Sequence, residues 1–139
     1  MSKRTPAVLA WLRLARVCAR VDHASAQHLR QWGLSVAQFD VLAQVGAAEG
    51  LSQQELAARL LVTKGNVTQL LDRMQRDDLI VRCQEGRTNC LFLTEKGRRL
   101  FDAVVPAQEA LIAERFAALS GQEQLQLLKL LRTLDHALG

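Results

Sequence analysis

The stretch from Leu51 to Arg76 reads LSQQELAARLLVTKGNVTQLLDRMQR and contains two amphipathic segments joined by a short turn. The first segment opens on Ser-Gln-Gln-Glu at 52–55, a capping-box pattern that predicts a helix over 53–59. In the second segment, apolar residues recur at spacings of three and four between Val67 and Met74. This periodicity predicts a helix over about 64–77, with Thr63 as its N-cap. The whole stretch therefore predicts a helix-turn-helix.

The outward face of the second helix has a composition suited to reading DNA. It carries no acid between residues 63 and 71, although a solvated face normally mixes acids with bases. Asn and Gln can pair with adenine, Lys with guanine, and a Thr methyl group can touch thymine. An ordinary solvated face remains the alternative. The predicted DNA-contacting residues are Thr63, Lys64, Gly65, Asn66, Thr68, Gln69 and Arg73.

Only one part of the chain is predicted to form strands. Residues 79–84 and 89–93 are rich in apolar side chains and flank Glu-Gly-Arg-Thr at 85–88. With Gly86 as the first of two central residues, a type II′ turn fits. This register sets Cys83 opposite Cys90 and places Arg87 at the tip. A helix predicted at 36–46, the two helices of the helix-turn-helix and this hairpin together predict a winged helix-turn-helix lobe over about 34–94.

Long helices are predicted on either side of this lobe, at about 6–31, 95–118 and 121–137. Thr5-Pro6, Thr94 and Ser120 are their predicted starts, and Ser35 is the start of a lobe helix at 36–46. Their apolar stripes are too extensive to be buried on so small a lobe. We therefore expect a single domain over 1–139, mainly α with a small β-hairpin wing, that forms a homodimer through residues 6–31 and 95–138.

The charge of the chain is unevenly distributed. The net charge is +4, and residues 1–31 carry six Lys and Arg against one acid. Residues 59–99, which include the predicted helix-turn-helix and wing, carry nine against five. A basic segment of this kind favours a polyanionic partner such as double-stranded DNA.

Two segments resemble the MarR family of bacterial transcription regulators. They are LSVAQFDVLAQVGAAEGLSQQELAARLLVTKGNVTQLLDRMQRDDLI, which starts at Leu34, and LFLTEKGRRLFDAVVPAQEALIAERFAALS, which starts at Leu91. The resemblance covers roughly residues 33–137. It implies an obligate dimer whose recognition helices enter successive major grooves of a pseudo-palindrome. It also implies a repressor that a small phenolic molecule or an oxidant releases from DNA.

The wing departs from the family pattern. The family usually carries Asp-x-Arg or Asp-Arg-Arg in a longer loop, whereas this chain has Glu85-Gly86-Arg87 in a loop about three residues shorter. By resemblance, Arg87 matches the arginine that enters the minor groove, with Glu85 as its orienting partner. The short wing also leaves open an alternative function, a protein-interaction module that does not bind DNA.

Two further sets of residues are candidates for signal sensing. Cys18, Cys83 and Cys90 are an odd number of cysteines without CxxC spacing, which argues against a disulfide framework or a structural zinc site. They are either redox-active or simply packed thiols. The family's effector pocket would lie between the first, second and fifth helices. Its candidate lining residues here are Trp11, Val17, Trp32 and Phe39.

Other classes of function find no support in the pattern. We find no nucleophile–base pair, no phosphate-cradling loop and no metal-ligand cluster, so we expect neither an enzyme nor a bound metal or cofactor. No apolar run approaches the roughly 18 residues of a membrane span, and residues 1–6 do not resemble a secretion signal. We expect a cytoplasmic protein.

Overall fold

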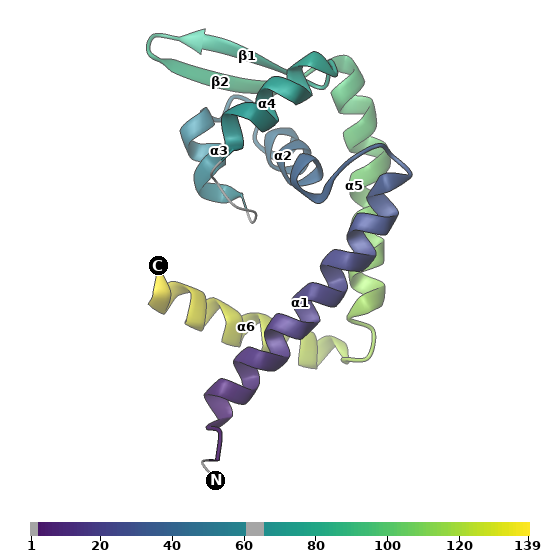
Figure 1. The fold of residues 1–139 in the computed structure, drawn as a ribbon, viewed down its shortest axis with the longest axis vertical. Helices are drawn as coiled ribbons and strands as arrows, with labels where there is room; N and C mark the ends of the chain where they lie inside the picture. Colours follow the sequence, from purple (N-terminus) through teal and green to yellow (C-terminus); the bar gives the residue numbers. More distant parts are fainter. Residues whose placement is uncertain (1–2, 61–65) are drawn as a thin grey trace.

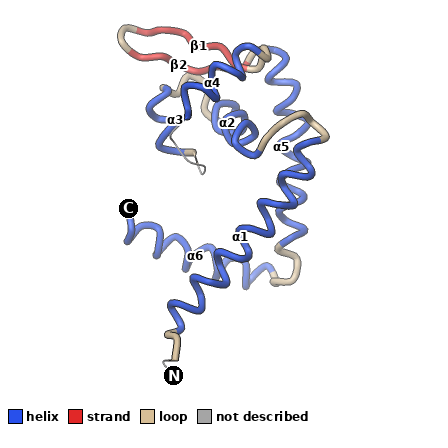
Figure 2. The backbone as a smooth tube through the Cα atoms, viewed as in Figure 1, coloured by secondary structure: helices blue, strands red, loops and turns tan. Residues whose placement is uncertain are grey.

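The computed structural model describes residues 3–60 and 66–139 of the chain. Figure 1 shows a lobe that carries the hairpin, with long helices extending away from it, and Figure 2 separates helix from strand. The described elements are, in order, α1 (Pro6–Arg30), α2 (Val36–Ala47), α3 (Gln53–Arg59), α4 (Val67–Arg76), β1 (Ile80–Glu85), β2 (Thr88–Leu93), α5 (Glu95–Arg115) and α6 (Gly121–Leu138).

The predicted starts of α1, α2, α3, α5 and α6 are confirmed. The hydroxyls of Ser35, Ser52 and Ser120 each accept a hydrogen bond from the amide three residues on. In each case the Gln or Glu at that third position accepts from the serine amide in return, completing a capping box. Thr5 and Thr94 cap α1 and α5 with one hydrogen bond each, which the threonine hydroxyl accepts from the amide three residues on. The predicted cap at Thr63 lies outside the described residues, and α4 as described begins at Val67 with Asn66 as its N-cap, later than the predicted start at about 64.

The wing has the predicted register. β1 and β2 pair antiparallel, with Glu85 opposite Thr88 and Cys83 opposite Cys90. Gly86 has φ of +61°, and no non-glycine residue of the described hairpin has positive φ. This matches a type II′ turn, which needs a positive φ only at its first central residue. Arg87 is therefore at the tip of the wing.

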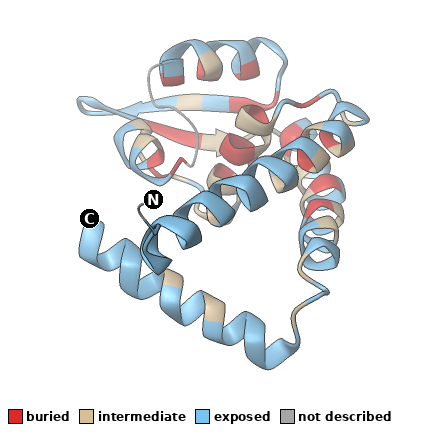
Figure 3. Ribbon diagram, turned by 60° about the horizontal axis from the view of Figure 1, so that its bottom comes forward, coloured by how far each residue is buried: buried red, intermediate tan, exposed pale blue. Residues whose placement is uncertain are grey.

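The core of the chain lies in the lobe. Figure 3 shows the buried residues gathered there and on the adjoining parts of α1 and α5. Leu56, Leu71 and Met74 are fully buried, as the periodicity of the two helices predicts. The remaining large side chains that are fully buried are Leu29, Val41, Leu42, Val45, Ile80, Leu91 and Val104. Apolar burial on this scale holds α4 and the wing in one rigid unit.

A tight contact and a polar network join α5 to the lobe and to α1. A Cβ added at Gly97 would stand 2.0 Å from the carbonyl oxygen of Leu79, so only glycine permits this approach. Farther along α5, His28 Nδ1 donates to Gln108 Oε1 at 2.9 Å, and Gln108 Nε2 donates to Ser25 Oγ at 2.7 Å. Gln108 is 2% exposed, and these bonds satisfy its buried amide.

The helices at the two ends of the chain are far more exposed than the lobe. In Figure 3, α6 and the N-terminal part of α1 are almost entirely exposed, and α6 buries no residue. No helix among the described residues is long and apolar enough to cross a membrane. Apolar side chains that stay exposed on these two helices are Val8, Leu9, Trp11, Leu12, Val17, Leu125, Leu128, Leu130, Leu134 and Leu138.

Candidate nucleic-acid interface

One side of α4 faces away from the core. Asn66, Thr68, Gln69 and Arg73 are all exposed, whereas Val67, Leu71 and Met74 are buried beneath them. Four of the seven predicted DNA-contacting residues thus share one accessible face. The other three, Thr63, Lys64 and Gly65, lie outside the described residues.

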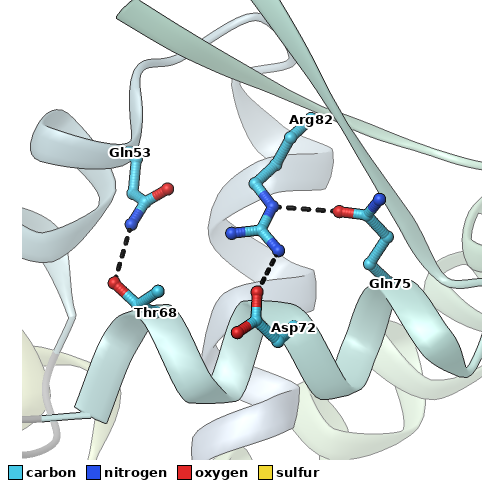
Figure 4. A network of polar contacts seen from close by, with 5 residues as sticks. All are labelled: Gln53, Thr68, Asp72, Gln75 and Arg82. Atoms are coloured by element: carbon cyan, nitrogen blue, oxygen red, sulfur yellow. Dashed lines mark hydrogen bonds and ion pairs between the residues drawn. The ribbon is translucent and has the colours of Figure 1, made fainter.

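The wing is tied to this helix by Arg82 of β1. Figure 4 shows its guanidinium between two side chains of α4. Arg82 Nε donates to Gln75 Oε1 at 2.9 Å, and Arg82 also forms an ion pair with Asp72. Asp72 is the acid nearest the predicted reading face. Its charge is therefore compensated within the protein, and its repulsion of a nearby phosphate is reduced.

A cleft of about 450 Å³ lies between α3, the start of α4 and the wing. It brings together residues far apart in sequence, since Arg87 of the wing lines it with Thr68 of α4. Its other lining residues are Gln53, Gln54, Ala57, Val67, Thr88 and Asn89. Sequence reasoning missed Gln53, Thr88 and Asn89. The predicted hairpin register could have indicated Thr88 and Asn89, because they follow Arg87 directly.

Glu85 and Arg87 are not partners in the structure. The Glu85 carboxylate accepts instead from the Cys90 thiol across the hairpin, at 3.7 Å between Sγ and Oε2. Arg87 is exposed and forms no ion pair within the described chain. Its guanidinium is available to a polyanion.

The three cysteines occupy different environments. Cys18 and Cys83 are exposed, and Cys90 is 8% exposed. Burial, followed by the negative charge of Glu85, raises the pKa of the Cys90 thiol above its ordinary value. A raised pKa lowers the thiolate fraction at neutral pH, so the environment of Cys90 argues against a peroxide-sensing role for this residue. For Cys18, the packing interpretation fits only if another chain covers α1.

The contact with Glu85 gives a testable pH dependence. We expect Glu85→Gln to lower the pKa of the Cys90 thiol, because it removes the carboxylate that disfavours the thiolate. The measurement is the pH dependence of alkylation in a Cys18→Ser, Cys83→Ser background, where only Cys90 reacts. The midpoint should move to lower pH in the glutamine variant. An unchanged midpoint would show that the Glu85 carboxylate does not raise this pKa.

The four candidate pocket residues are not brought together within one chain. Trp32 and Phe39 are half-buried against the lobe core. Trp11 is 64% exposed, near the far end of α1. At 1.5 Å per residue, about 28 Å of helix separates it from the C-terminal end of α1 at Arg30. Trp32 has a distinct feature, since its buried indole nitrogen has no hydrogen-bond partner within the described chain.

Comparisons with known proteins agree with this architecture. The model of the MarR family matches residues 32–88. An uncharacterized HTH-type transcriptional regulator of Bacillus cereus is 34% identical over 136 residues, covering 98% of this chain and 92% of the relative.

Solved structures extend the likeness to the whole fold. The crystal structure of AbsC, a MarR family transcriptional regulator from Streptomyces coelicolor, has a TM-score of 0.86 at 23% identity and covers 99% of this chain and 98% of that one. BpsR of Bordetella bronchiseptica, whose DNA binding is regulated by 6-hydroxynicotinic acid, has a TM-score of 0.82 at 22% identity, covering 96% and 99%. The chain belongs to the MarR family of helix-turn-helix transcriptional regulators.

Proposed function

We propose that this regulator is a homodimeric repressor that binds a pseudo-palindromic duplex and is released by a small molecule. The observation that carries the proposal is the exposed face of α4. It presents amide, hydroxyl and guanidinium groups, its nearest acid is ion-paired, and the basic tip of the wing lies beside it. A bound dimer would occlude the promoter, which is the physical basis for repression. Because the ligand is chromosomal DNA, we place the protein in the cytoplasm.

The dimer is inferred from the exposed apolar side chains of α1 and α6. Leu130 and Leu134 are 67% and 51% exposed in the single chain, and Trp11 is 64% exposed. An exposed apolar surface of this extent on two helices is typical of a protein interface. A twofold axis lets the same surface cover itself. The predicted division into a DNA-binding lobe at about 34–94 and dimerisation helices at 6–31 and 95–138 is part of this proposal.

Dimer symmetry sets the form of the DNA site. Two recognition helices related by a twofold axis read an inverted repeat, and they reach successive major grooves when the half-sites lie about 10 base pairs apart. Asn66, Gln69 and Arg73 would contact base edges from one groove. Arg87 would contact the flanking backbone or minor groove.

A gel shift with random-sequence duplex DNA at low salt tests the proposal against its alternative. Binding that weakens steeply with added salt supports a DNA-binding regulator, because it reports the release of counterions from phosphate. Absence of binding at low salt, about 50 mM, would favour the protein-interaction module that the short wing leaves open.

The role of Arg87 can be measured through the salt dependence of binding. We expect Arg87→Gln to make the slope of log K against log salt shallower by about two units per dimer, since each phosphate contact contributes about 0.9. The control is Lys129→Gln, which removes one charge from the polar side of α6. A slope that is equal in both variants would show that the wing does not touch DNA.

The proposed effector is a small apolar or phenolic molecule with an oxygen acceptor. Trp32 supports this class, because a buried N–H without a partner costs about 1–3 kcal/mol and an acceptor would satisfy it. The 6-hydroxynicotinic acid that regulates DNA binding by BpsR is a small aromatic molecule with oxygen acceptors. The test is Trp32 fluorescence in a Trp11→Phe background during titration with phenols and hydroxynicotinic acids. Release of DNA without a change in that fluorescence would place the effector elsewhere.

A further inference from the structure

A hydrogen bond links the helix before the turn to the reading face of α4. Gln53 Nε2 at the start of α3 donates to Thr68 Oγ1 at 3.2 Å, as Figure 4 shows. Gln53 is half-buried and Thr68 is exposed, and both line the cleft below the wing. The contact therefore lies where bound DNA would meet the protein.

This bond restricts what the Thr68 hydroxyl can offer to a ligand. A hydroxyl carries one hydrogen and two lone pairs, and the Gln53 amide occupies one lone pair. The hydroxyl makes no other hydrogen bond within the described chain. No acceptor within the described chain takes its hydrogen, which points away from Gln53. One lone pair also remains, so the bond biases the hydroxyl toward donating without excluding acceptance.

We propose that Gln53 is a positioning residue that presents the Thr68 hydroxyl to DNA as a hydrogen-bond donor. This inference rests on the proposed function, because it assumes that the N-terminal part of α4 enters the major groove. A donor selects bases with an acceptor there. Guanine offers N7 and O6 and thymine offers O4, whereas cytosine offers only the N4 donor. The base opposite Thr68 should therefore be guanine or thymine in preference to cytosine.

The substitution Gln53→Glu reverses the direction of the bond. An ionised glutamate has no donor, so the Thr68 hydroxyl must donate to it and can only accept from DNA. We expect the preference at one position of each half-site to move from guanine or thymine toward cytosine or adenine. The control is Gln54→Glu, which adds the same charge in the first turn of α3. Gln54 lines the same cleft but makes no side-chain hydrogen bond within the described chain.

The experiment selects binding sites from a random duplex library with the full-length protein and compares base frequencies position by position. At the position opposite Thr68, the native protein should favour its base by about fivefold. Thr68→Val should make the four base frequencies at that position nearly equal, and Thr68→Ser should retain the preference. Gln53→Glu should reverse the base preference at that position. Gln54→Glu should weaken binding to all sequences alike.

Three results would overturn the inference. If Gln53→Glu and Gln54→Glu give the same base profile, the bond does not set the preference. If Thr68→Val changes the base frequencies at no position while the native protein still selects a site, Thr68 contacts phosphate. The inference about Gln53 then fails, and the proposed function stands. If the native protein selects no sequence, the proposed function fails together with it.

Discussion

Replacing both Asn66 and Gln69 by alanine is expected to lower the affinity for the selected operator by about 1000-fold or more. Each amide that pairs bidentately with a base contributes about 1–3 kcal/mol of discrimination, and a dimer carries four such groups. The loss is bounded by non-specific affinity, which is roughly 10³–10⁷-fold weaker than specific binding in such proteins. Binding to random-sequence DNA should therefore change by no more than about twofold. Fluorescence anisotropy with operator and random duplexes measures both.

The control for this prediction removes two amides elsewhere, by Gln122→Ala and Gln126→Ala on α6. All four side chains are exposed, so neither double variant should change the melting temperature appreciably. Equal losses on operator and random DNA in the Asn66, Gln69 variant would mean that this face of α4 contacts only the backbone.

Introducing a charge at Leu134 is expected to dissociate the proposed dimer. Leu134 lies on the same side of α6 as Leu127 and Leu131, which are half-buried, yet it is itself 51% exposed. If a partner chain covers it, Leu134→Lys removes about 1.5–3 kcal/mol of burial from each subunit. The twofold axis doubles this loss, so the dissociation constant of the dimer should rise at least about 100-fold. Sedimentation velocity across a concentration series measures the change.

The matched control is Gln122→Lys, which adds the same charge on the polar side of α6. This variant should remain dimeric and bind DNA as tightly as the native protein or slightly more tightly. A Leu134→Lys protein that stays dimeric would show that the exposed apolar side of α6 is not the dimer interface.

The elements of the lobe could be predicted because each is determined locally. Ser35 and Ser52 start helices through side chains three residues away, and Gly86 sets its turn through its own φ. The register that places Cys83 opposite Cys90 follows directly from that turn. Local rules of this kind are visible in a single sequence.

The side-chain partners could not be predicted in the same way. Glu85 had two neighbours within reach, Arg87 along the chain and Cys90 across the hairpin, and spacing alone does not choose between them. The bonds of Gln53 to Thr68 and of Arg82 to Asp72 depend on how α3, α4 and β1 cross, which is set by packing. The exposure of Trp11 likewise depends on packing, because no element of the described chain covers it.

The DNA site itself decides whether this chain is a dimeric, sequence-specific regulator. Selection from a random duplex library, followed by determination of the stoichiometry on the enriched duplex, reports sequence specificity and symmetry together. We predict an inverted repeat with half-sites about 10 base pairs apart, bound by one dimer. Enrichment of no sequence over random DNA, or binding of a single half-site by one chain, would contradict this prediction.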